Sequence, residues 1–338
     1  MDAIFLQLLN GLDKGSAYAL IALGLTLIFG TLGVVNFAHG ALFMMGGFCA
    51  VGLQMLLKLS TPVKDESIPG LEMTVDVPYL QVWFGDTGLE IISYAVPLSV
   101  ILAIPVMLLI GIIMERGLIR HFYHRTHADQ ILVTFGLAIV LQELIKSAFG
   151  ATPIPVPAPQ ALTGSANVGE WLGMGANVSY PWWRLVYFSF SLAVIAMVFA
   201  FLQFTTFGMV VRAGMRDRET VGLLGIHIER RFTIVFGIAV VVAGVAGAMY
   251  TPIVSPNYRI GMDFLVLSFV VVVVGGMGSL PGAVASGFLL GILQSFASMN
   301  EIKQLIPGID QVIVYLIAVV ILLTRPRGLM GRKGVMED

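Results

Sequence analysis

A glycine-rich segment with one amide and one imidazole side chain interrupts a long apolar stretch. Residues 15–57 contain no Asp, Glu, Lys or Arg and are long enough for two membrane-spanning helices. Within them, residues 30–40 place Asn36 and His39 three positions apart, so a helix would carry both on one face. Polar groups at membrane depth are costly and usually face a cavity or another helix. We therefore expect Asn36, His39 and Gly40 near a pathway or its gate. The alternative, which is commoner, is a tight hairpin turn in which Asn36 caps the next helix.

A second glycine-rich segment interrupts the apolar stretch 264–300. It comprises Gly275, Gly276, Met277, Gly278, Ser279, Leu280, Pro281 and Gly282. It is not a dinucleotide fingerprint, because Pro281 stands where the third glycine belongs, and no Gly-Lys-Ser/Thr follows to form a phosphate loop. We expect a sharp break between two helices. The second of these helices would carry Gly287 and Gly291 as a small-residue packing face.

A basic loop, residues 208–231, contains a third candidate site. Residues 217–224 predict a short helix that is acidic at its start and is ended by Gly225. Val221 and Leu224 would give this helix an apolar side, which indicates docking into a groove of another protein. A helix resting on lipid headgroups is the alternative. The expected contact residues are Arg216, Asp217, Glu219, Gly222, Leu224 and Gly225.

Other chemistry is sparse. Glu143 is the clearest carboxylate within an apolar segment, and Lys146 lies one helical turn further on, so the two are expected to pair. An ion-driven carrier usually has an intramembrane ionisable relay, and this sequence shows little of one. His121, His124 and His127 could bind zinc by residue type, but a solvated basic loop is the favoured interpretation. We expect no metal, no cofactor and no catalytic residues.

The composition defines the class of protein that must position these segments. Of 338 residues, 57% are hydrophobic and 12% are charged, about half of the roughly 25% usual in soluble domains. The net charge of −1 gives no reason to expect nucleic-acid binding. The sequence predicts an all-α polytopic membrane protein formed by one domain, residues 1–338. The apolar stretches allow nine helical segments, or eight crossings plus a re-entrant segment.

Basic residues predict the orientation of these helices. Segments 115–130, 208–231 and 325–338 hold 12 of the 19 Lys and Arg residues and should be cytoplasmic. Segment 59–90 has one basic residue, Lys64, against six acidic residues. Segment 150–183, which ends in a Trp-Trp pair, has no Lys or Arg. Both segments should lie outside.

These segments together resemble the LivH-type permeases of the branched-chain amino-acid family of ABC importers. The resemblance rests on residues 9–12, 15–30, 36–41, 115–116, 131–137 and 275–283, and it runs along most of the chain. Loop 208–231 is similar to the coupling loop of such permeases. Glu219 and Gly225 follow the spacing of its Glu-Ala-Ala…Gly element, with Thr220 and Val221 in place of the two alanines.

The resemblance implies a permease subunit, not an enzyme, in a bacterial inner membrane. It implies two separate ATPase subunits that use ATP, and a related LivM-like permease or a second copy of this chain. It also implies a periplasmic solute-binding protein facing 59–90 and 150–183. The resemblance also implies contact with membrane lipid. The transported solute would be small and polar, most simply a branched-chain or related amino acid. An ion-coupled secondary transporter of amino acids is the alternative.

Overall fold

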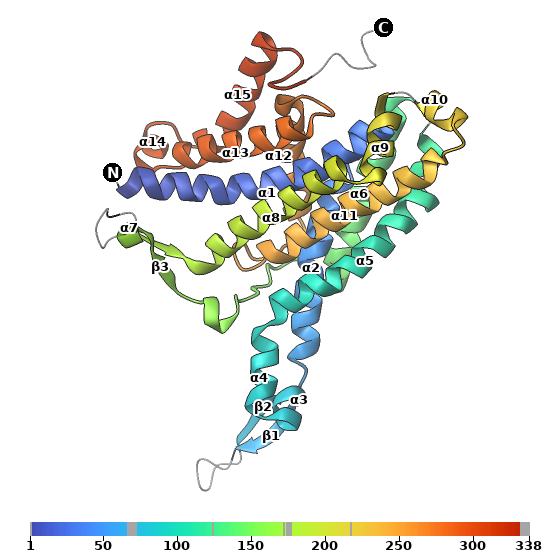
Figure 1. Cartoon of the computed structure of the whole chain (residues 1–338). Coiled ribbons are helices and arrows are strands. Elements are labelled where there is room, and N and C mark those ends of the chain that lie inside the picture. Colours follow the sequence, from blue (N-terminus) through green and yellow to red (C-terminus); the bar gives the residue numbers. More distant parts are fainter. Residues whose placement is uncertain are drawn as a thin grey trace.

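The computed structural model describes residues 2–65, 73–123, 125–171, 173, 178–216 and 218–331 (Figure 1). Seven helices within these ranges are long and apolar enough to cross a membrane: α1 (Asp2–Leu32), α2 (His39–Leu57), α5 (Ala95–Gly117), α6 (His127–Phe149), α8 (Trp182–Phe204), α11 (Ile228–Tyr250) and α13 (Leu280–Ala297). Two shorter apolar helices are α12 (Ile260–Gly275) and α15 (Ile309–Thr324). The protein is therefore a mostly helical, polytopic membrane protein, as the composition predicts.

Helix α1 is the central element of the bundle and packs most closely against α13. Glycines allow this approach: a β-carbon at Gly11 would lie 2.5 Å from Ile292 Cα, and one at Gly15 would lie 2.8 Å from Phe288 Cα. Gly287 and Gly291 of α13 pack directly on the α1 backbone, at Ala19 and Gly15. Small residues that let helix backbones meet are the usual means of association in lipid. The predicted small-residue face of α13 is confirmed.

Helix α2 runs at a steep angle to α1 and α11 (Figure 1). It contacts α11 through paired glycines, Gly46 against Gly244 and Gly47 against Gly247. A side chain at Gly46 or Gly247 would overlap the backbone of the opposite helix. The crossing point is therefore fixed by backbone contact rather than by interlocking side chains.

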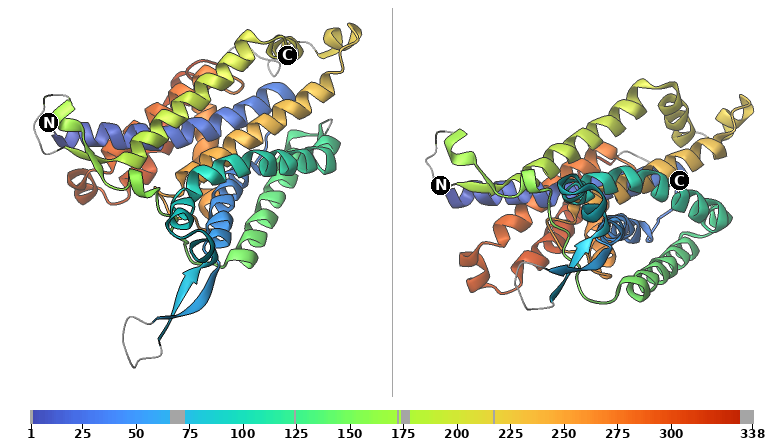
Figure 2. Two further views of the ribbon diagram at one scale, coloured as in Figure 1. Left: turned by 60° about the horizontal axis from the view of Figure 1, so that its bottom comes forward. Right: turned by 90° about the horizontal axis from the view of Figure 1, so that it is seen from below.

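The all-α prediction is wrong in both segments predicted to be external. Strands β1 (Ser60–Asp65) and β2 (Met73–Pro78) form an antiparallel hairpin, and β3 (Ser165–Asn167) pairs with β4 (Ser179–Pro181). The β-branched residues that alternate along the first hairpin suit a pleated pair, and its charges conceal that pattern. Together with α3 (Tyr79–Phe84) and α4 (Asp86–Ser93), β1 and β2 form an arm that projects from the bundle (Figures 1 and 2).

The remaining short elements gather at two opposite ends of the bundle (Figure 2). At the N-terminal end of α1, buried residues of segment 166–180 pack against Phe5, Leu6 and Leu9. This segment includes α7 (Val168–Trp171) and is preceded by η2 (Gln160–Leu162), and α14 (Asn300–Leu305) leads into α15. The opposite end carries η1 (Ile119–Phe122), α9 (Thr206–Arg216) and α10 (Arg218–Leu223).

Candidate functional site

The first glycine-rich break is an extended connection that begins at Gly33 and enters the protein interior. Gly33 has φ +68, a conformation that favours glycine, and the chain continues to the start of α2 at His39. Asn36 is fully buried, and its Oδ1 accepts a hydrogen bond from the Ala38 backbone N–H at 3.0 Å. This bond closes a turn before α2 and is not the expected cap, because the N-cap residue of α2 is Ala38 and no described side chain caps that helix. Asn36 precedes α2, so the expected helix face shared with His39 does not form.

The extended connection is held by α6. Thr134 Oγ1 accepts a hydrogen bond from the Phe37 backbone N–H at 3.0 Å and lies 3.3 Å from the Val35 carbonyl oxygen. The Phe37 ring contacts Phe135 of α6 and Phe269 of α12, with centroids 6.4 Å and 5.3 Å away. Non-helical backbone at membrane depth is tolerated where protein satisfies it in this way.

His39 is fully buried where α1, α2 and α11 meet. A β-carbon at Gly24 of α1 would lie 2.5 Å from His39 Nε2 and 3.1 Å from the Ala239 carbonyl oxygen. Neither ring nitrogen has a hydrogen-bond partner among the described residues. The next residue, Gly40, packs directly on the Gly261 carbonyl of α12. The three predicted residues therefore lie together, in the interior of this chain rather than on an open channel wall.

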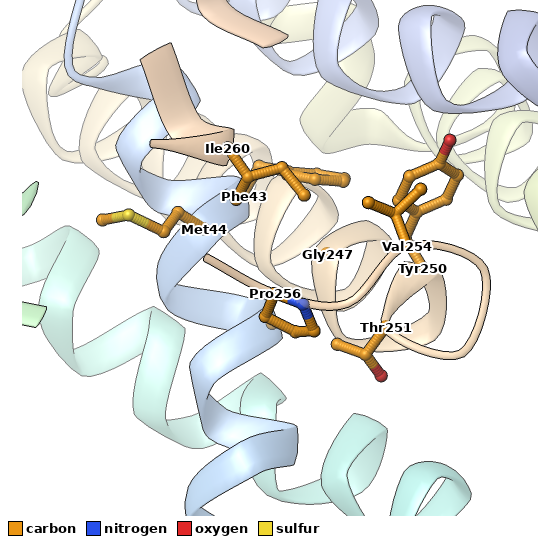
Figure 3. Close-up of a pocket in the computed structure, with 9 residues that line it drawn as sticks. Phe43, Met44, Gly247, Tyr250, Thr251, Val254, Pro256 and Ile260 are labelled. Carbon is orange, nitrogen blue, oxygen red and sulfur yellow. The ribbon is translucent and has the colours of Figure 1, made fainter. Parts of the chain in front are cut away.

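A small pocket lies one turn further along α2 (Figure 3). It is lined mainly by apolar side chains, including Phe43 and Met44 of α2, Tyr250 of α11 and Ile260 of α12. Phe43 also stacks on Phe264 with ring centroids 4.8 Å apart. Aromatic and apolar packing thus continues from His39 along α2 towards the loop between α11 and α12.

The second glycine-rich break is a tight connection between α12 and α13. Gly276 and Gly278 have φ values of +99 and +82. Ser279 caps α13, its Oγ accepting a hydrogen bond from the Gly282 backbone N–H at 3.2 Å. A β-carbon at Gly275 would lie 2.5 Å from the Gly282 carbonyl group. The structure brings all the residues of the predicted break together here: Gly275, Gly276, Gly278, Pro281 and Gly282.

The two breaks and the basic loop converge at one end of the bundle. A β-carbon at Gly30 would lie 2.9 Å from Met215 Cε of α9 and 3.5 Å from Gly278 Cα. The C-terminal segment joins them, since Leu329 N–H donates to the Val274 carbonyl at 2.8 Å and Met330 N–H donates to the Gly275 carbonyl at 3.0 Å. Segments far apart in sequence therefore form one contiguous contact.

The basic loop contains two helices rather than one. The apolar stretch 185–211 is not one helix, because it breaks at Thr205 between α8 and α9. Helix α10 (Arg218–Leu223) agrees with the predicted helix within its ends, and Gly225 follows with φ +77. The described residues do not include Asp217 or the side chains of Arg216 and Glu219.

The predicted apolar side of α10 is wrong. Val221 is 6% exposed and faces the bundle, whereas Leu223 and Leu224 are 86% and 73% exposed. A six-residue helix that ends before Leu224 cannot carry Val221 and Leu224 on one continuous face. The side available to a partner is instead the Leu223–Leu224 tip, beside the open position of Gly222.

A buried ion pair joins α1 and α8, and no pattern in the sequence indicated it. Asp13 of α1 is 2% exposed, and its Oδ2 lies 3.5 Å from Arg184 Nη1 of α8, which also donates to Asn10 Oδ1 at 3.0 Å. Burial, with a contribution from the Asp13 charge, raises the pKa of the nearby Tyr180 hydroxyl to about 12. Asp13 lies just before the charge-free stretch, and no local spacing links it to Arg184.

The expected Glu143–Lys146 pair is confirmed. Lys146 Nζ lies 3.1 Å from Glu143 Oε2, and both side chains are exposed on α6. An exposed pair of this kind contributes little to stability, about 0–1 kcal/mol. It does not form a buried relay, so it gives no support to an ion-driven carrier.

The long apolar helices define a multi-pass membrane protein. The family described as "Branched-chain amino acid transport system / permease component" matches residues 7–322, and this chain belongs to it. Its function is that of a permease component of a branched-chain amino acid ABC transport system.

Relatives match along nearly their whole length. The high-affinity branched-chain amino acid transport permease LivH of Escherichia coli (strain K12) is 27% identical over 334 residues, covering 97% of this chain and 96% of the relative. BraD of Pseudomonas aeruginosa is 28% identical over 338 residues, with the same coverage. A probable LivH of Methanocaldococcus jannaschii is 24% identical and covers 92% of this chain and 88% of the relative. No solved structure matches the chain.

Proposed function

We propose that this chain forms part of the translocation pathway for branched-chain amino acids and that ATPase subunits drive it through α9 and α10. One contact carries the proposal. Met215 of α9 packs against Gly30 near the end of α1, and Gly30 in turn lies beside Gly278 in the α12–α13 connection. Through it, a displacement of α9 would act at once on the end of α1 and on the α12–α13 connection. Closely packed helices transmit such displacements as rigid bodies.

Asn36, His39 and Gly40 are the proposed gate residues. Asn36 lies in the irregular connection that follows α1 and is tied to α6 by Thr134, and His39 and Gly40 begin α2. Movement at Gly30 would therefore be passed to the start of α2 within a few residues. His39 packs on Gly24, so a shift of α1 along α2 would change the surroundings of the imidazole.

The proposed orientation has α9, α10 and the C-terminal segment in the cytoplasm. The basic loops of this end support it by the positive-inside rule. The arm within 59–90 and the segment 150–183 would lie outside, where a solute-binding protein docks. Helices α12 and α15 have 16 residues each, about 24 Å, short of the roughly 30 Å hydrocarbon core. Counting both as crossings gives nine in all, and eight if one of them is re-entrant.

The proposed assembly contains this chain, a related permease or a second copy, two ATPase subunits and a solute-binding protein. Membership of the family supports the ATPase and binding-protein partners. The bacterial relatives LivH and BraD are branched-chain amino acid transport permeases, which supports branched-chain amino acids as the solute. ATP would be bound and hydrolysed by the partner subunits alone.

The proposal is tested by purifying the tagged chain in mild detergent with its ATPase subunits. The double variant Leu223→Ser/Leu224→Ser removes the exposed apolar tip, and we expect most of the co-purifying ATPase to be lost. Leu305→Ser is the control, because Leu305 is similarly exposed, at 82%, but is the last residue of α14 at the opposite end. Undiminished recovery of the ATPase with the double variant would refute the docking site.

A further inference from the structure

An open pocket of about 320 Å³ lies at the start of α12, at the end of the bundle opposite α10. Ala151 and Pro153, in the connection after α6, line one part of it, and the rest is lined by Asn257, Tyr258, Arg259 and Asp263. Pockets that bind small molecules commonly measure about 300–1,000 Å³. The pocket is therefore large enough for a single amino acid.

Arg259 provides a positioned positive charge in this pocket. Its Nε donates to the Tyr258 hydroxyl at 2.8 Å, and its backbone N–H donates to Asn257 Oδ1 at 2.9 Å. The guanidinium also lies over the Tyr258 ring, 5.2 Å from the centroid, and Lys146 Nζ lies 5.3 Å from the same centroid. Contacts of a cation with an aromatic face hold both groups in place.

Asp263 provides the opposite charge one helical turn further on. Residues four apart with opposite charges usually pair on a helix. Here the part of the chain that the structure describes contains no ion pair between Arg259 and Asp263, although both line the same pocket. The pocket thus presents a guanidinium and a carboxylate that do not neutralise each other.

We propose that this pocket binds the zwitterionic backbone of an amino acid on its way into the permease. The solute carboxylate would pair with Arg259, whose planar guanidinium matches carboxylate geometry, and the solute ammonium would pair with Asp263. The apolar surface of Ala151 and Pro153 would contact the aliphatic side chain. This assignment rests on the proposed function and names the residues that recognise the solute.

The test is the binding of L-leucine to the complete transporter in lipid nanodiscs, without the solute-binding protein, followed by saturation-transfer-difference NMR. We expect Arg259→Gln and Asp263→Asn each to weaken leucine binding by about tenfold or more, the loss typical of a charged hydrogen bond. Glu301→Gln, which alters an exposed charge on α14 and not in the pocket lining, should leave the binding unchanged.

Half-ligands make the assignment specific. Arg259→Gln should abolish the binding of 4-methylpentanoate and spare that of 3-methylbutylamine, and Asp263→Asn should do the reverse. Equal binding by the wild type and both variants would overturn the proposal. So would variants that bind leucine normally but fail to capture the solute-binding protein, because the pocket would then be a docking contact. Failure of the proposed function can be told apart from failure of the pocket assignment, because the wild-type chain would then purify without an ATPase.

Discussion

At the residue scale, Gly24 leaves the space that the buried His39 ring occupies. Gly24→Ala would place a methyl group 2.5 Å from His39 Nε2, so the imidazole or α1 must shift. We expect a loss of about 1–3 kcal/mol of stability, typical of overpacking, and a fall in solute uptake. The measurements are the thermal unfolding midpoint in detergent and uptake in cells. Gly136→Ala is the control, since nothing lies within 4 Å of the added carbon on α6; equal behaviour of the two variants would contradict the packing described.

Asn36 is expected to act first by holding the turn before α2. Asn36→Ala removes the acceptor of the Ala38 N–H and should cost about 1 kcal/mol of stability. Asn36→Ser retains an acceptor and should recover most of that loss. If uptake recovers with stability in the serine variant, the turn bond explains the residue. If uptake stays low in a stable serine variant, the amide has a role in the gate beyond the turn bond.

The buried pair of Asp13 and Arg184 should behave differently from the exposed pair of Glu143 and Lys146. Arg184→Gln leaves a buried carboxylate without its cation, which typically costs 3–5 kcal/mol. The double variant Asp13→Asn/Arg184→Gln removes both charges and should regain much of the stability. Glu143→Gln should shift the unfolding midpoint little. A double variant that is less stable than Arg184→Gln would contradict the role assigned to the pair.

At the scale of elements, the breaks were predictable and the loops were not. The glycines and Pro281 mark the ends of α12 and α13 because few other residues adopt the required backbone. The β1–β2 hairpin was concealed by its charges, and the break at Thr205 lies inside an apolar stretch whose single glycine, Gly208, comes three residues later. The ion pair of Asp13 and Arg184 joins residues that are 171 positions apart in the sequence, so only the fold brings them together.

Helix α9 provides a separate test of coupling. Met215→Ala removes the contact with Gly30 and should reduce uptake several-fold, while the ATPase subunits still co-purify and hydrolyse ATP. Met209→Ala, on the same helix but exposed, is the matched control. Parallel loss of ATPase recovery and uptake in Met215→Ala would mean that the residue stabilises the loop rather than transmits its movement.

At the scale of the whole molecule, the segregation of loops to two ends predicts labelling from opposite sides. In a Cys49→Ser background, an impermeant maleimide should label Val63→Cys of the arm in intact cells. Leu224→Cys should be labelled only after the membrane is opened, and Leu305→Cys should behave like Val63→Cys. All three side chains are exposed in the structure. Labelling of Leu224→Cys in intact cells would reverse the proposed orientation.

The most direct test of the account is leucine accumulation by proteoliposomes that contain the purified assembly and its solute-binding protein. We predict accumulation that requires ATP on the side of α10 and that is lost in Leu223→Ser/Leu224→Ser but retained in Leu305→Ser. Accumulation driven by an ion gradient, with this chain alone and without ATP, would contradict the account.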